Sequence, residues 1–249
     1  MSFIEVWNLI IANPVLNVLV ALSHILGGSF GFAIIVLTVI VRLVSWPLTR
    51  RQLKSSKAMQ DMQPKIQELQ KKYGKNQKKL QQEMMKLYRE AGVNPLGCIW
   101  PMLIQFPMWI ALYQAIMSAL ATTPESLLGL AHRLYSWDIV SQAIPLSSKF
   151  LWLDLGQPDP YFILAIIVGG TMWVQQKMIQ APSVDPRQAS TSRMMMLMMP
   201  IMFGFLTLMF PSGLALYWAV SNVIGIITQY FFTGGWGYLK FRSPFQSTQ

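Results

Sequence analysis

Arg42 is the side chain with the clearest chemical potential in this sequence, because it interrupts the apolar run from Phe30 to Leu48. A guanidinium is costly at membrane depth, so a charge there commonly marks a binding or transport site. Thr38 lies one helical turn earlier on the same face and could add a hydroxyl. Arg50 follows eight residues later, about 12 Å along a helix, which also allows Arg42 to snorkel to the membrane surface. A functional charge and a snorkelling side chain are both open.

Polar side chains also recur in three other apolar runs. They are Gln105, Gln114, Gln175, Gln176, Ser221 and Asn222. Polar residues on four helices predict a shared hydrated cavity within the membrane. Its candidate residues are Arg42, Thr38, Gln105, Gln175, Ser221 and Asn222. Ordinary hydrogen bonding between neighbouring helices is the alternative explanation.

Signatures of enzymatic chemistry are missing from the sequence. It has no G-x-x-x-x-G-K-[ST] segment to hold the phosphates of a nucleotide. His24, His132 and Cys98 are too few for a metal site. Residues 27–31 match G-x-S-x-G, but a nucleophile elbow also needs a preceding strand and a positioned histidine and acid. We therefore expect no enzyme activity, catalytic residue, metal or cofactor.

The composition places the chain in a membrane. Hydrophobic residues make up 53% of the sequence and charged residues only 12%, with a mean hydropathy of +0.39. Apolar runs of about 20 residues, each long enough to cross a bilayer, recur along the chain. We predict an all-α polytopic membrane protein with five transmembrane helices, a cytoplasmic antiparallel helical hairpin and an N-terminal interfacial helix.

The predicted organisation follows the sequence from end to end. Residues 1–28 form an amphipathic interfacial helix at the outer face, with a sixth span as the alternative. The five spans are residues 29–49, 94–120, 160–180, 194–210 and 213–233. Between and after them lie a cytoplasmic basic coiled-coil hairpin (50–93), an extracytoplasmic loop (121–159), a cytoplasmic loop (181–193) and a cytoplasmic tail (234–249).

Positive charge is concentrated between Arg50 and Glu90. This segment holds twelve basic and four acidic residues, which give +8 of the net charge of +10. Residues 121–160 hold four acidic and two basic residues, a net charge of −2. The positive-inside rule therefore places the basic segment in the cytoplasm. With an odd number of spans, the N-terminus lies outside and the C-terminus inside.

Apolar residues in the basic segment recur at intervals of three and four, which predicts two helices packed through a coiled-coil seam. The two series are Met59, Met62, Ile66, Leu69 and Tyr73, and Leu80, Met84, Leu87 and Ala91. The candidate partner-binding residues are Arg50, Arg51, Lys54, Lys57, Lys71, Lys72, Lys75, Lys78 and Lys79. Such residues attract anionic lipid headgroups as well as RNA. Lipid, a ribosome or another partner, and a solvated face that only fixes topology remain open.

Four motifs of the chain resemble the YidC/Oxa/Alb family of membrane protein insertases. They are residues 38–49 (TVIVRLVSWPLT), residues 62–66 (MQPKI), residues 94–97 (NPLG) with 103–107 (LIQFP), and residues 210–218 (FPSGLALYW) with Ser221-Asn222. The resemblance extends from Phe30 to Phe232. The chain closely resembles the bacterial YidC branch, in a short form without a large periplasmic domain.

The resemblance implies a hydrophilic groove that opens to the cytoplasm and the lipid, with Arg42 as the charge on its floor. Thr38 and Trp218 fall at family positions that line the groove or contact a client. Trp218 stands where tyrosine is common, which removes a hydroxyl. The implied function is to insert and help fold nascent membrane proteins in the bacterial cell membrane without nucleotide hydrolysis. The implied partners are the Sec translocon, components of the signal recognition particle and the ribosome.

Two other classes of protein remain open on the residues alone. A small transporter or channel would also bury an arginine among polar residues, although the chain shows neither repeat symmetry nor paired broken helices. A structural membrane scaffold would use the same residues for assembly.

Overall fold

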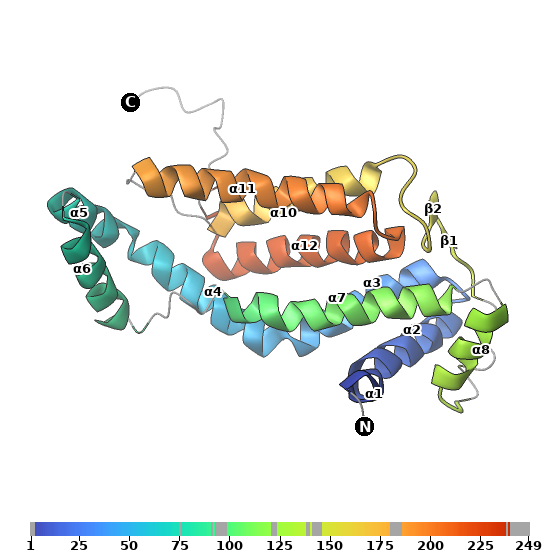
Figure 1. Cartoon of the computed structure of the whole chain (residues 1–249). Coiled ribbons are helices and arrows are strands. Elements are labelled where there is room, and N and C mark those ends of the chain that lie inside the picture. Colours follow the sequence, from blue (N-terminus) through green and yellow to red (C-terminus); the bar gives the residue numbers. More distant parts are fainter. Residues whose placement is uncertain are drawn as a thin grey trace.

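The protein is built almost entirely from helices (Figure 1). The computed structural model describes residues 3–74, 76–90, 92, 99–120, 124–137, 140, 146–179, 186–237 and 239. Its elements are α1 (Phe3–Trp7), a π-helical turn (Asn8–Ala12), α2 (Asn13–Ile25), α3 (Phe30–Val44), α4 (Trp46–Asp61), α5 (Gln63–Tyr73), α6 (Gln77–Glu90), α7 (Ile99–Ala119), α8 (Pro124–Arg133), β1 (Lys149–Phe150), β2 (Leu153–Asp154), α10 (Ile163–Ile179), α11 (Pro186–Thr207) and α12 (Ser212–Thr233).

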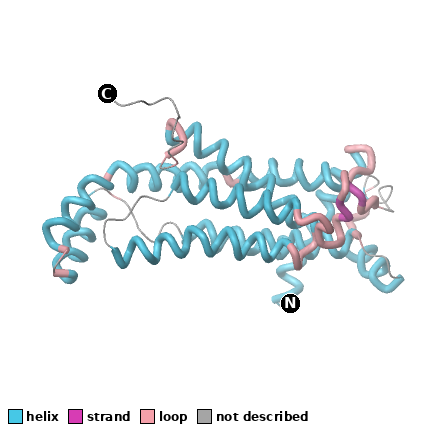
Figure 2. The backbone as a smooth tube through the Cα atoms, turned by 90° about the horizontal axis from the view of Figure 1, so that it is seen from above, coloured by secondary structure: helices cyan, strands magenta, loops and turns pink. Residues whose placement is uncertain are grey.

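Helices α3, α7, α10, α11 and α12 lie lengthwise beside one another and form an elongated body (Figures 1 and 2). Helix α12 is the central element, since it packs against α3, α7 and α10. Its first eight residues, 212–219, are all buried. Helices α5 and α6 stand at one end of the body, and α8 with the two strands lies at the other (Figure 1).

Hydropathy and length identify helices that could cross a membrane. In the described part of the chain these are Ile4–Ile25 and Ser212–Thr233, with windows of mean hydropathy 1.7 and 1.3. The bent pair α3 and α4 adds a third if it is one span, and Ile163–Ile179 and Met196–Thr207 are shorter apolar helices. The five predicted spans map onto α3, α7, α10, α11 and α12, but their number as membrane crossings stays a prediction.

The N-terminal helix uses its polar face inside the protein. Asn17 is fully buried, donates to the carbonyl of Arg133 at 2.9 Å and accepts from the backbone N–H of Tyr135 at 2.7 Å. Arg133 donates in turn to Asn13 at 2.9 Å and to Ser118 at 2.9 Å, and burial lowers its pKa. The asparagines that indicated an interfacial helix thus bind α8 and the chain after it. The helix from Ile4 to Ile25 is also long and apolar enough for the alternative, a sixth span.

A sharp bend separates α3 from α4. The two axes differ by 63° across Ser45, so the helix that was predicted to span residues 29–49 ends at Val44. Pro47 explains the break, because it has no N–H to bond the carbonyl of Leu43 four residues earlier and its ring crowds that carbonyl. The bend leads the chain out of the helical body toward α5 and α6 (Figure 1).

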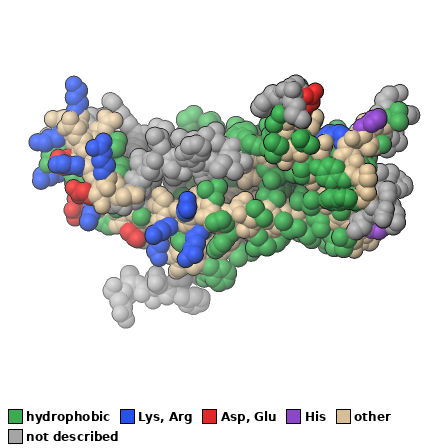
Figure 3. Space-filling view, turned by 90° about the horizontal axis from the view of Figure 1, so that it is seen from below, with side chains coloured by type: hydrophobic (Ala, Val, Ile, Leu, Met, Phe, Trp, Pro, Cys, Tyr) green, Lys and Arg blue, Asp and Glu red, His purple; other side chains and the backbone are tan. Residues whose placement is uncertain are grey.

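Helices α5 and α6 pack on each other through a small apolar cluster. Met62 and Ile66 are its buried residues, and Met84, Leu87 and Tyr88 pack against them. Burial raises the pKa of the Tyr88 hydroxyl. The ammonium groups of Lys72 and Lys79 each lie 5.4 Å from the centre of the Tyr73 ring. Lys and Arg side chains gather on this end of the molecule, beside an apolar body (Figure 3).

The opposite end is closed by a short hairpin that the sequence did not reveal, because strands of two residues are too short to show alternation. Strands β1 and β2 pair antiparallel, and the Phe150 ring lies directly over Gly31 at the start of α3. The backbone N–H groups of Ser212 and Gly213 donate to the carbonyls of Gln157 and Leu155. This segment therefore ties the start of α3 to the start of α12.

Glycines bring α10 and α11 into close contact. A Cβ atom on Gly169 would lie 3.2 Å from the carbonyl oxygen of Pro200, and one on Gly204 would lie 3.3 Å from that of Ala165. Small residues on facing helices allow such backbone approach within membranes.

Replacing Gly169 with valine is therefore expected to push α10 and α11 apart and to destabilise the protein by roughly 1–3 kcal/mol. Gly170→Val is the matched control, since a Cβ there meets nothing within 4 Å. Thermal unfolding of both variants in detergent measures the difference. Equal losses of stability in the two variants would show that the close contact between α10 and α11 at Gly169 does not determine the stability.

Candidate functional site

Arg42, in the last turn of α3, joins this helix to α12. Its Nε donates to Ser221 Oγ at 2.9 Å, and its Nη2 donates to the same Oγ at 2.6 Å and to the Ser221 carbonyl at 2.7 Å. These are its hydrogen bonds to the described part of the chain. The guanidinium is thus held inward by a neutral residue of a neighbouring helix.

No acidic side chain pairs with Arg42 among the described residues. Its charge is partly stabilised by its position in the last turn of α3, because the carbonyl end of a helix carries partial negative charge. A helix dipole supplies much less than a full counter-ion. The site therefore keeps a net positive charge that an incoming anion can neutralise.

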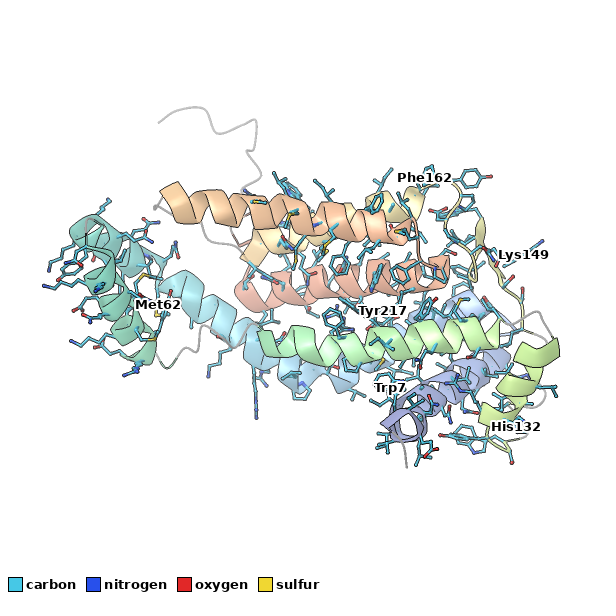
Figure 4. All side chains as sticks on the ribbon, in the orientation of Figure 1. Trp7, Met62, His132, Lys149, Phe162 and Tyr217 are labelled. Carbon is cyan, nitrogen blue, oxygen red and sulfur yellow. The ribbon has the colours of Figure 1, made fainter. Side chains whose placement is uncertain are left out.

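Tyr217 extends this site toward α7, and the sequence analysis did not assign it a role. Gln105 Nε2 donates to the Tyr217 hydroxyl at 2.5 Å, and that hydroxyl also interacts with Ser221. Figure 4 shows Tyr217 between α12 and α7. Its spacing from Ser221, four residues on one helix, was the signal that could have found it. Gln105, Tyr217, Ser221 and Arg42 thus link α7, α12 and α3.

The other predicted polar residues lie in different surroundings. Thr38 is fully buried, and its hydroxyl donates to the carbonyl of Ile34 on its own helix at 2.6 Å. Asn222 donates to Thr171 Oγ1 on α10 at 3.2 Å, and Gln175 lies over Gly225, where a Cβ would clash with its amide. Neither Asn222 nor Gln175 bonds Arg42, so their membership of one hydrated site stays a prediction.

Trp218 lies in an aromatic cluster that joins three helical segments. Its ring centre is 5.7 Å from that of Trp109 on α7, 5.4 Å from that of Phe203 on α11 and 6.0 Å from that of Phe210. The side chain is only 6% exposed, and its indole N–H has no partner in the described part of the chain. Packing is what this environment demonstrates for Trp218, while client contact stays a prediction.

The predicted partner-binding residues of the basic segment are exposed wherever the structure describes them. Arg50, Arg51, Lys54 and Lys57 lie on α4, Lys71 and Lys72 end α5, and Lys78 and Lys79 begin α6. Lys75 lies outside the described residues. Lys and Arg side chains gather at this end of the molecule (Figure 3).

Anion binding is the chemistry that this arrangement supports. Within the described residues, no group of three or more His, Cys, Asp or Glu side chains could hold a metal ion. The Arg42 site offers a positive charge held by Ser221, the hydroxyls of Ser221 and Tyr217, and the amide of Gln105. Carboxylate and phosphate groups are the anions whose geometry a guanidinium matches in proteins, and carboxylates are the ones that protein chains carry as side chains.

Comparisons with known proteins agree on one family. Residues 21–236 match the model of the family described as 60Kd inner membrane protein. Proteins named membrane protein insertase YidC are similar to the chain: one from Nitratidesulfovibrio vulgaris is 39% identical over 224 residues, and one from Tolumonas auensis is 41% identical over 220. The matches cover 90% and 88% of this chain but 38% and 35% of those relatives. The chain thus spans less than two fifths of their length.

Proposed function

Because the chain belongs to the 60Kd inner membrane protein family, in which it resembles the YidC insertases, we propose that it inserts membrane proteins into the bacterial inner membrane and helps them fold. The observation that carries the proposal is the Arg42 guanidinium, held by Ser221 without an acidic partner in the described part of the chain. A client with acidic residues in its outer tail would supply the missing negative charge.

The proposed path begins at the Arg42 site. The client's hydrophilic tail enters the membrane through a groove around Arg42, where polar contacts lower its cost of desolvation. Its apolar segment meanwhile moves along α10 and α12 into the lipid. Both helices expose large apolar side chains that suit this route, among them Ile166, Trp173, Val223 and Ile227.

Burial of the client's apolar segment drives the reaction, at about 25 cal/mol per Å² of apolar surface. The membrane potential adds about 2.3 kcal/mol per charge per 100 mV and moves acidic tails outward. These two terms require no nucleotide hydrolysis by the protein. Arg42 acts as a transient partner that the tail leaves once it has crossed.

The charge distribution supports a proposed orientation and a second role. The basic end with α5 and α6 faces the cytoplasm, following the positive-inside rule, and the end with β1 and β2 faces outward. With five spans, the N-terminus lies outside and the C-terminus inside. The exposed lysines and arginines of α4, α5 and α6 bind anionic headgroups, the ribosome or targeting factors, and the protein works alone or beside the Sec translocon.

Reconstitution tests the proposed function. A purified single-span client with a short acidic outer tail is presented to liposomes that contain the protein, an unrelated membrane protein or no protein. Protection of the tail from external protease is expected only with the first. Equal protection in all three preparations would show that the protein has no insertase activity of its own.

A further inference from the structure

Ser221 accepts hydrogen bonds from both edges of the Arg42 guanidinium that could bind a carboxylate. A guanidinium offers two double-donor edges, one made by Nε and Nη2 and the other by Nη1 and Nη2. Ser221 Oγ accepts from Nε and Nη2 at 2.9 and 2.6 Å and fills the first edge. The Ser221 carbonyl accepts from Nη2 at 2.7 Å, which takes one donor of the second edge.

Only Nη1 is left for an anion. It has no hydrogen-bond partner in the described part of the chain, and it is not fully buried. A carboxylate that approaches this guanidinium can therefore make single hydrogen bonds to Nη1. A paired contact, in which two donors of one edge bind the same carboxylate, would require Ser221 to lose its hydrogen bonds to Arg42.

The surroundings of Ser221 keep its side chain from rotating away from Arg42. Its side chain is only 5% exposed, and the Tyr217 hydroxyl interacts with it from one helical turn away. Tyr217 is itself held by Gln105 of α7. The serine oxygen is thus supported by three helices rather than free to rotate toward solvent.

We propose that Ser221 limits Arg42 to single hydrogen bonds with the client's carboxylates and thereby sets how fast an acidic tail is released. The proposal rests on the proposed function and adds to it a residue that determines release. Each hydrogen bond between a guanidinium and a carboxylate is roughly twice as strong as a neutral one, and a paired contact adds a second such bond and fixes the geometry. An insertase that made them would retain its clients.

Dissociation kinetics test this role. The probe is a dye-labelled single-span peptide with three aspartates in its outer tail, bound to the full chain in nanodiscs and displaced by excess unlabelled peptide. Ser221→Ala frees the edge made by Nε and Nη2, so release is expected to become about tenfold slower, as one further charge-assisted hydrogen bond would give. A peptide with asparagines in place of the aspartates should show no change.

Three further variants make the outcome decisive. Ser221→Thr keeps the hydroxyl and should restore the wild-type rate. Thr228→Val removes a hydroxyl of α12 whose hydrogen bonds, among the described residues, go to Ile224 and Gly225 of the same helix, and it should leave the rate unchanged. Arg42→Gln should release the aspartate peptide faster than the wild-type protein does.

The possible outcomes distinguish a failure of the proposed role of Ser221 from a failure of the proposed insertase function. Unchanged or faster release from Ser221→Ala, while Arg42→Gln still weakens binding of the aspartate tail, would overturn the role of Ser221 alone. Identical release from wild type and Arg42→Gln would overturn the role of Ser221 and the Arg42 site together. If the protein gives the client no more protease protection in the liposome assay than the control preparations do, the proposed insertase function itself is overturned.

Discussion

Replacing Arg42 with glutamine is expected to reduce insertion of an acid-tailed client by about 10- to 100-fold, the value of one charge-assisted hydrogen bond in a desolvated site. Glutamine can still bond Ser221, so the link between α3 and α12 is largely kept while the charge is lost. The initial rate of protease protection in liposomes that carry a membrane potential measures the effect.

Two controls isolate the charge. Arg42→Lys keeps a positive charge and should retain more activity than Arg42→Gln, although an ammonium cannot reproduce the three bonds to Ser221. A client whose tail carries asparagine instead of aspartate should be inserted at similar rates by wild type and Arg42→Gln. Equal loss with both clients would mean that Arg42 supports the fold rather than recruiting acidic tails.

Truncating Trp218 to alanine is expected to lower the free energy of unfolding by about 3–5 kcal/mol, the usual cost of removing a large aromatic from a packed core. The ring touches aromatic side chains from α7, from α11 and from the turn before α12, so its loss opens a cavity where these segments meet. Reversible unfolding in mixed micelles, followed by tryptophan fluorescence, gives the change.

Trp173→Ala is the matched control, because the Trp173 side chain is 38% exposed on α10 and contributes less packing. Trp218→Phe should recover much of the lost stability, since the unpartnered indole N–H contributes no hydrogen bond to the described part of the chain. If Trp218→Ala is as stable as wild type but inserts clients poorly, then Trp218 acts through client contact instead of packing.

The sequence predicted the helical membrane fold and the family well, because both depend on local and long-range patterns of residue type. Apolar runs and basic clusters follow from the cost of placing charge in lipid. The resemblance to the YidC/Oxa/Alb family, based on the motifs around Arg42, Pro107 and Trp218, is confirmed by the family match over residues 21–236.

Details that depend on packing were less accessible. The asparagines of α2 indicated an amphipathic helix, but Asn17 satisfies its amide against α8 and the chain after it, a contact more than one hundred residues away. Pro47 was visible in the sequence, yet the 63° bend at Ser45 was not predicted. Hydropathy alone does not distinguish a kinked helix from a straight one.

The polar residues of the candidate site show the same limit. Arg42 and Ser221 were both selected by their type, and the structure brings them together. Asn222 was selected by the same reasoning but bonds Thr171 of α10, because adjacent residues of a helix point about 100° apart. Tyr217 was overlooked as an aromatic residue in an apolar helix, although its hydroxyl links Gln105 to Ser221.

Photo-crosslinking from the client locates its acidic tail during insertion. A photoreactive residue is placed next to an aspartate in the outer tail, insertion is stopped part-way, and the crosslinked residues are mapped by mass spectrometry. The predicted result is crosslinks to α3 and α12 around Arg42 and Ser221 that disappear with Arg42→Gln. Crosslinks confined to α5 and α6, or unchanged by Arg42→Gln, would contradict the proposal that this charge receives the client.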